Sequence, residues 1–170
     1  MAIQQNTAID DALIVWLAAL ESGFTFAPNW QSWADTEIVA LDEPPLWLIH
    51  LSLANTTEEA LVALWDGGSQ LPSEVWQKLN LTALHLGFLY LRFKRGDFNL
   101  AILLERAGIQ VDSSDFEIEC EAFYFLLNEL DGLGPIHASD RPLLDRVEDL
   151  FGPMIALARE RWSNLSMTNV

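Results

Sequence analysis

Histidine and cysteine are the residues of this chain with the most specific chemistry, so their spacing decides which reactive sites the sequence allows. His50, His85 and His137 each stand alone: none has a glutamate three residues before it, and none belongs to a His-Glu-x-x-His motif. Metal centres need several converging ligands, and we therefore expect no metal and no cofactor. We interpret His50 and His85 as core histidines with one hydrogen bond each, with a shared pocket as the alternative.

Covalent catalysis finds little support in the sequence. Cys120 is the single cysteine, and the charges of its neighbours Glu119 and Glu121 raise the pKa of a thiol and favour an inert side chain. The chain has no Gly-x-Ser-x-Gly elbow, phosphate-cradling loop or dinucleotide fingerprint. Asp42 and Glu43 could act as general acid and base, but adjacent acids more often begin a solvated helix. We assign no catalytic residue, and the balance is against an enzyme.

Charge is distributed unevenly along the chain. The sequence has 25 acidic and 9 basic residues, a net charge of -16, and the segment before Lys78 holds 11 acids without a lysine or arginine. Such a surface repels nucleic acids and anionic membranes, and it speeds the encounter with a basic protein. We therefore predict a basic protein partner, with no direct contact to nucleic acid or membrane.

The candidate binding site lies within this acidic segment. Residues 24–37 combine aromatic side chains with Pro28, Asn29 and Ser32, which break any regular period and predict a packed loop. Aromatic residues with a polar rim are typical of interface hot spots, although the tryptophans could equally belong to the core. The predicted site comprises Trp30, Trp33, Asp35, Glu37, Asp42 and Glu43.

One basic cluster, formed by Arg92, Lys94 and Arg95, interrupts this acidic character. It could hold an anion. Its position at the carboxyl end of a predicted helix favours a plainer role, in which the cations complement the helix dipole and pair with acids of the same chain.

Composition favours helices as the elements that position these residues. The chain has 29 Leu and 18 Ala against 7 Val and 10 Ile, and 170 residues suit one domain with a sizeable core. We predict an all-α single domain over residues 1–170, with about seven to eight helices and a frayed tail at 163–170. The lone cysteine and a start without a basic and apolar signal predict the cytoplasm.

The most apolar stretch, residues 79–93, is expected at the centre of this bundle. Apolar residues alternate along this stretch as in a strand, but Leu84, Phe88 and Leu91 also share a helical face. The composition of the chain favours the second interpretation, so we predict a helix over residues 73–95. Asn80 and Gly87 are the positions at which this helix is most easily interrupted. The run is too short and too polar for a membrane span.

Capping residues and breakers predict the other helices. The least secure is the one after Ser114, because residues 116–122 alternate and could form a strand. Gly152 and Pro153 should kink or split the last helical region. The expected ranges are 7–22, 37–41, 42–54, 55–68, 98–107 (capped by Asp97 and ended by Gly108), 114–130 and a final region from 139.

Two short fragments resemble parts of one tetratricopeptide repeat: Leu86, Gly87 and Tyr90, followed by Gly96, Asp97, Phe98 and Ala101. The spacing between them is about two residues too long, and the chain shows no second copy. We carry over no peptide-binding role, since two adjacent antiparallel helices explain the same residues.

These observations favour a protein-protein interaction module of inhibitor or immunity type, whose acidic surface mimics phosphate charge toward a basic partner. One alternative is a small-molecule-binding module or enzyme with a pocket between helices, which uses His50 or His85 beside tryptophans. Another is a structural protein that associates with itself.

Overall fold

The computed structural model describes residues 2–25, 29–114, 119–133 and 141–167, and it confirms the all-α prediction. These residues form nine helices and no strand. The chain divides into two compact units, which we describe separately. Unit 1 comprises residues 1–81 and 160–170, and unit 2 comprises residues 82–159. The single-domain expectation stays a prediction.

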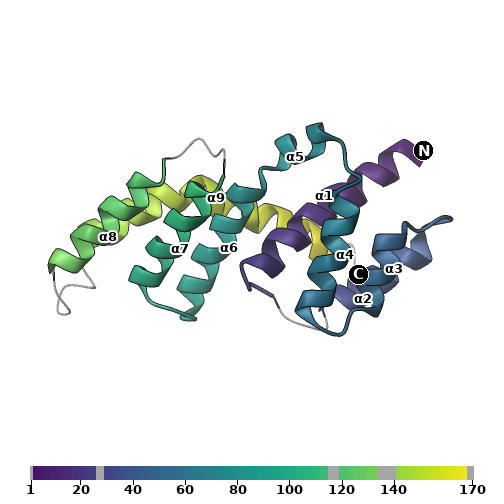
Figure 1. Cartoon of the computed structure of the whole chain (residues 1–170), viewed down its shortest axis with the longest axis horizontal. Coiled ribbons are helices and arrows are strands. Elements are labelled where there is room, and N and C mark those ends of the chain that lie inside the picture. Colours follow the sequence, from purple (N-terminus) through teal and green to yellow (C-terminus); the bar gives the residue numbers. More distant parts are fainter. Residues whose placement is uncertain (1, 26–28, 115–118, 134–140, 168–170) are drawn as a thin grey trace. The chain divides into compact units, whose positions relative to one another are not determined.

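Unit 1 contains five complete helices and the carboxyl-terminal end of a sixth. The helix α1 packs against α4 and α5, and α3 packs against both α2 and α4 (Figure 1). The bounds are α1 (Ala2–Glu21), α2 (Asn29–Ala40), α3 (Leu46–Leu53), α4 (Thr57–Gly68) and α5 (Ser73–Leu79), together with residues 160–167 of α9 (Arg141–Met167).

The core of unit 1 is built around α1. Its inner face carries Ile9, Leu13, Trp16, Leu17 and Leu20, which are all buried. The helix begins at Ala2, five residues before the predicted Thr7 start. An isolated helix of this length is only marginally stable in water. Burial of the long apolar face therefore supplies most of the stability of α1.

Tryptophan rings fill the remaining space in unit 1. The ring centroid of Trp16 lies 5.7 Å from that of Trp33 and 5.2 Å from that of Trp162, and Trp162 also meets Phe24 edge-on at 5.2 Å. The contact with Trp162 explains why the predicted frayed tail is helical as far as Met167: these last turns of α9 bury Leu165 in unit 1.

Unit 2 contains α6 (Leu81–Arg95), α7 (Leu100–Asp112), α8 (Glu121–Leu133) and α9 as far as Arg159. Consecutive α6 and α7 run antiparallel, side by side (Figure 1). One apolar cluster draws on all four helices, with Phe123 and Phe151 meeting edge-on at 5.5 Å. The continuous run Ala83–Tyr90 of α6 is buried, as its apolar sequence predicts.

The predicted helix over residues 73–95 is interrupted. Asn80 adopts a left-handed conformation with φ of 45° and caps α5, and α6 begins at the next residue. Asparagine tolerates this conformation better than most residues, so the break occurs at a predicted weak point. Gly87, the other one, is helical and packs against the α9 backbone at Met154.

Two predicted helix ends on α7 are wrong. Asn99, not Asp97, caps the helix, because its side chain accepts a hydrogen bond from the Ile102 amide at 3.0 Å while Asp97 binds two arginines. Gly108 does not end the helix. A Cβ atom at Gly108 would lie 2.7 Å from the Tyr124 ring, so the glycine lets α8 approach closely.

The remaining boundaries agree to different degrees: α4 ends at Gly68 as predicted, whereas α3 begins at Leu46, four residues after the predicted start at 42. Thr56 and Glu59 form a capping box at the start of α4, within the predicted range 55–68. The prediction of a helix from Ser114 or a strand over 116–122 falls partly outside the described residues, because 115–118 are not described; α8 begins at Glu121. The helix α9 passes without a break through Gly152 and Pro153.

Candidate functional site

The six residues of the predicted binding site lie on α2 and on the turn that follows it. Trp30 and Trp33 are buried in the core of unit 1, so they are not surface anchors. Asp35 is exposed on α2, Glu37 is half-buried, and Asp42 and Glu43 are exposed before α3. The structure therefore separates the aromatic residues from most of the acidic rim.

The predicted loop at residues 24–37 is a helix from Asn29 onward, which corrects the sequence interpretation. Trp30, Trp33 and Ala34 follow one another at helical spacing and point into the core. The indole of Trp30 also donates to the carbonyl of Ala54 at 3.2 Å, and the amide of Gln31 donates to the same oxygen at 2.7 Å. These tertiary contacts outweigh the weak helix propensity of Asn29 and Ser32.

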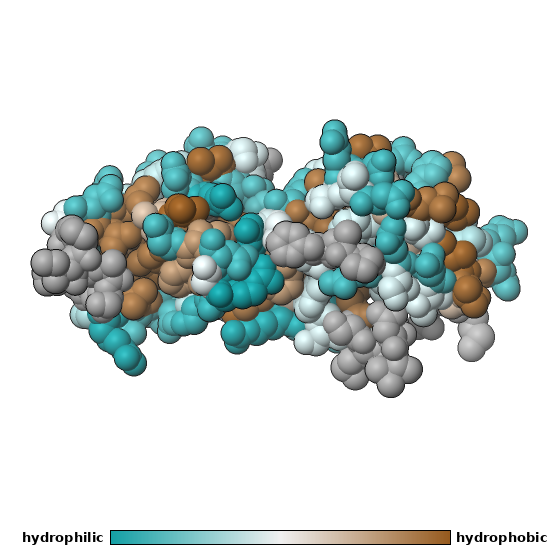
Figure 2. Space-filling view, turned by 90° about the horizontal axis from the view of Figure 1, so that it is seen from below, coloured by the Kyte–Doolittle hydropathy of each residue, from teal (hydrophilic) through white to brown (hydrophobic). Residues whose placement is uncertain are grey.

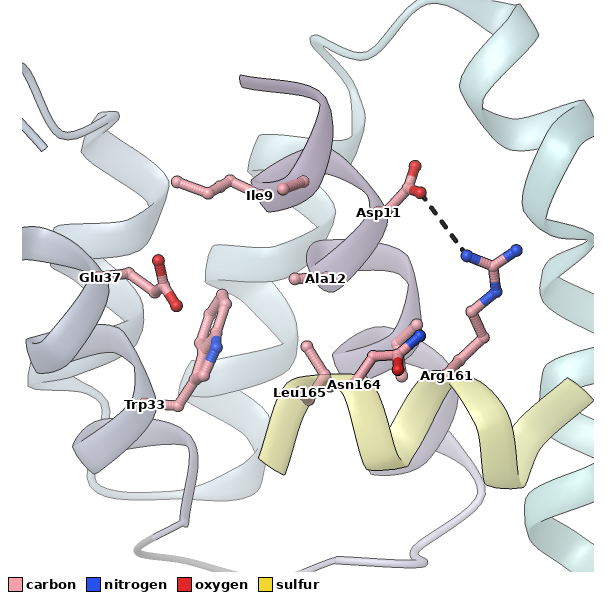
Figure 3. A pocket seen from close by; sticks show the side chains of 10 residues that line it. Ile9, Asp11, Ala12, Trp33, Glu37, Arg161, Asn164 and Leu165 are labelled. Carbon is pink, nitrogen blue, oxygen red and sulfur yellow. Dashed lines mark ion pairs between the residues drawn. The ribbon is translucent and has the colours of Figure 1, made fainter. Parts of the chain in front are cut away.

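Two of the predicted residues, Trp33 and Glu37, line a cavity of about 230 Å³ within unit 1. Figure 3 shows α2 on one side of this cavity, α1 behind it and the end of α9 below. We call it the α1/α2/α9 cavity. Its walls are Ala8, Ile9, Asp11, Ala12, Val15, Trp33, Glu37, Arg161, Asn164 and Leu165.

Charged groups stand at opposite sides of the α1/α2/α9 cavity (Figure 3). The carboxylate of Asp11 accepts an ion pair from Lys78 at 2.9 Å, and Arg161 approaches it at 3.8 Å. Across the cavity, burial raises the pKa of the Glu37 carboxyl. The two sides therefore differ, with two cations beside Asp11 at one edge and a partly buried carboxyl of raised pKa, Glu37, at the other.

Two of the side chains that line this cavity carry buried donors without a hydrogen-bond partner among the described residues. The indole Nε1 of Trp33 and the Nε of Arg161 are buried and have no hydrogen-bond partner. Trp33 as a whole is 2% exposed, so this nitrogen cannot reach bulk water. Buried donors are nearly always paired in folded proteins, and an unpaired one calls for a specific explanation.

A second concave surface lies between α3 and α4, outside the six residues of the predicted binding site; it is lined by His50, which the sequence analysis named for a pocket only as an alternative. This α3/α4 groove has a volume of about 900 Å³. Leu53 and Val62 line it with apolar side chains that are 68% and 65% exposed, and Glu58, Glu59 and Asp66 bring three carboxylates to it. Figure 2 shows apolar surface between hydrophilic residues in the part of the view that contains α3.

The charges of unit 1 are almost entirely negative. It holds 12 acidic residues, and its two lysine or arginine residues are Lys78 and Arg161. Both approach the same carboxylate, that of Asp11. Unit 1 has no other lysine or arginine that could neutralise the carboxylates of the α3/α4 groove.

The predicted basic cluster lies in unit 2, and its cations bind acids of that unit. Arg92 and Arg95 both contact Asp97, at 2.9 and 2.7 Å, and Lys94 binds Glu148 at 2.9 Å. These hydrogen bonds hold the pKa of Asp97 well below its usual range. The favoured interpretation, internal pairing at a helix end, is confirmed.

His50, His85 and Cys120 lie on three different helices or their flanks, and His137 lies outside the described residues. His85 is buried in α6, whereas His50 is exposed and lines the α3/α4 groove, contrary to its assignment to the core. Burial and the nearby carboxylates of Glu121 and Asp112 raise the pKa of the Cys120 thiol. No group of three or more potential metal ligands occurs in the described part of the chain.

Sequence reasoning missed the two concave surfaces for different reasons. The α1/α2/α9 cavity needs Arg161, which is 150 residues from Asp11 in the chain, and no local pattern links them. The groove did leave a signal: Val62 lies among Glu58, Glu59 and Asp66 on the exposed face of α4 and is itself exposed.

Comparison with known proteins adds no functional information: no protein-family model, curated protein or solved structure matches the chain. Among the described helices, none has both the length and the apolar character to cross a membrane.

Proposed function

We propose that this chain is a protein-protein interaction module in which the α3/α4 groove of unit 1 binds a basic, amphipathic segment of another protein. One observation carries the proposal: exposed Leu53 and Val62 lie in a groove with three carboxylates, in a unit whose lysine and arginine both approach Asp11. Apolar contacts would supply affinity, and the carboxylates would select the charge of the partner.

The dimensions and spacing of the groove favour a helical segment. Two packed helices leave a groove between their side-chain rows, and an amphipathic helix can place its apolar residues there. Lysine or arginine residues on the flanks of that helix would meet Glu58 on one helical turn and Asp66 two turns later on the same helix. Proteins that bind nucleic acids carry such basic segments, which agrees with a phosphate-mimicking inhibitor in the cytoplasm.

Affinity capture from lysate with matched charge variants tests this proposal. We expect the wild-type chain to retain a basic protein at low salt and to release it near 0.5 M salt, because screening shortens the reach of these charges to a few ångströms. The double variant Glu58→Lys with Asp66→Lys should lose that protein. The control, Asp131→Lys with Asp149→Lys, makes the same charge change at exposed positions of unit 2 and should retain it.

A direct titration identifies the cause of any loss. A lysine-rich amphipathic peptide labelled for fluorescence anisotropy should bind the wild type at least about tenfold more tightly than the groove variant, while its glutamate counterpart should not bind. Equal retention by the groove variant and the wild type would reject the groove. Retention of no protein at either salt concentration would reject the interaction function.

A further inference from the structure

Trp65 is a large aromatic side chain that remains 46% exposed on α4 of unit 1. It lies three residues after Val62, a spacing at which two residues are neighbours on the surface of a helix. Val62 lines the α3/α4 groove, whereas Trp65 does not. An amphipathic segment that packs its apolar residues on Val62 would therefore meet Trp65 with the basic residues on its flank.

Two contacts fix the orientation of the Trp65 ring. The ring stacks on that of Trp76 in α5, with the centroids 5.9 Å apart and the two planes at 17°. Its indole Nε1 donates a hydrogen bond to Glu21 Oε1 at 3.1 Å. A ring that is already held in place loses little conformational freedom when another group covers it, which lowers the entropic cost of binding.

The electrostatic surroundings of Trp65 favour a cation as that group. The face of an indole ring attracts cations, and the carboxylate of Glu21 lies at the edge of this ring. Unit 1 has two lysine or arginine residues of its own, Lys78 and Arg161, and both approach Asp11. A cation that stacks on Trp65 would therefore come from the partner.

We propose that Trp65 selects arginine over lysine at the flank of the basic segment bound by the α3/α4 groove, through stacking of one guanidinium on its indole ring. This assignment rests on the proposed function, because it specifies the sequence of the same partner. A guanidinium is planar and weakly hydrated, whereas the ammonium of lysine is a compact and strongly hydrated charge. Stacking on the ring therefore costs less desolvation for arginine than for lysine.

Two peptides that differ only in their cations test this selectivity. One carries arginine and the other lysine at every basic position of the same amphipathic sequence, and fluorescence anisotropy measures the binding of each to the full chain. We expect the arginine peptide to bind about threefold more tightly, as a cation on a partly exposed ring would give. Equal affinities would overturn the selectivity and leave the groove in place. Binding of neither peptide would reject the proposed function together with it.

Matched variants attribute the selectivity to one side chain. Trp65→Leu keeps an apolar residue and removes the ring, so the two affinities should become nearly equal while that for the lysine peptide changes less than about twofold. Val62→Ala is the control, because it removes an apolar contact from both peptides and should weaken them to the same extent. An arginine preference that persists in Trp65→Leu would belong to the acidic surface in general and would overturn the proposal.

Nuclear magnetic resonance keeps the test decisive if Trp65→Leu disturbs the packing of α5. The indole N–H resonance of Trp65 in the isotope-labelled wild type is identified by its loss in Trp65→Phe. Saturation with the arginine peptide should shift this resonance more than saturation with the lysine peptide does. The indole resonances of Trp30 and Trp33 should shift less, because both rings are buried in the core. A Trp65 resonance that both peptides leave unchanged would overturn the proposal.

Discussion

The pKa values of carboxyl groups shift in opposite directions in the two units. In unit 2, hydrogen bonds from arginine and lysine lower the pKa of Asp97, Glu129 and Glu148. In unit 1, burial raises the pKa of Asp10 and Glu37. Unit 2 thus binds its carboxylates internally, whereas unit 1 has few cations with which to do so. The α3/α4 groove, the proposed binding surface, therefore carries its carboxylates in the unit with fewer lysine and arginine residues.

The largest expected effect tests the internal packing of unit 2. A Cβ atom at Gly87 would meet the backbone carbonyl of Met154, which cannot move aside as a side chain can. We expect Gly87→Ala to lower the free energy of unfolding by about 3 kcal/mol. Hydrogen exchange of peptides from α7 and α8 would measure the loss in unit 2.

The matched control for Gly87→Ala is a glycine with open space around it. Gly132 lies in α8, and a Cβ atom there would meet nothing within 4 Å. Gly132→Ala should therefore stabilise unit 2 by about 0.5 kcal/mol through its helix propensity. Equal destabilisation by both substitutions would show that the approach of α6 to the Met154 backbone is not the cause.

A second, smaller effect concerns the paired acid Asp97. Because its pKa is lowered in the folded state, it stabilises unit 2 above the usual aspartate pKa of about 3.9, and this contribution is lost as the pH falls further. We expect Asp97→Asn to lower the thermal midpoint at neutral pH, with a difference from the wild type that shrinks in acid. Thermal unfolding by circular dichroism over this pH range measures it; a difference independent of pH would contradict the ion-pair explanation.

The smallest effect has the opposite sign and belongs to unit 1. The folded-state pKa of Glu37 is raised, so ionised Glu37 costs stability above that pKa, and the cost disappears as the pH falls through it. Glu37→Gln should stabilise unit 1 at neutral pH by less than about 1 kcal/mol, since the side chain is partly in water. All seven tryptophans belong to unit 1, so denaturation followed by their fluorescence reports on this unit. A stabilising effect that persists in acid would argue against ionisation as its cause.

Local signals in the sequence predicted much of the fold but little of the tertiary environment. The leucine and alanine content, together with capping residues and helix breakers, was sufficient for the helical class and several helix positions. Asn29 and Ser32 were misleading because their local preferences yield to the burial of two tryptophans in α2. Gly108 was read as a helix end, since a sequence does not show which ring will pack on a glycine.

The candidate sites were harder to predict because they depend on exposure and on distant residues. The negative charge of the first half was visible in composition, and its contrast with unit 2 follows from the same count. Whether a tryptophan faces solvent or core was not visible, and Trp30 and Trp33 face the core. The groove and the cavity arise only when α3 meets α4 and when α9 meets α1 and α2.

The division of unit 1 between two distant parts of the chain also affects how it folds during synthesis. Residues 1–81 leave the ribosome before the 78 residues of unit 2, and Glu160 follows only after them. At usual rates of translation this delay lasts roughly 4 to 16 s. During that time Trp16 and Phe24 lack the ring of Trp162, while unit 2 is contiguous and can fold as it emerges. Unit 1 can therefore complete its aromatic core only after the whole of unit 2 has been synthesised.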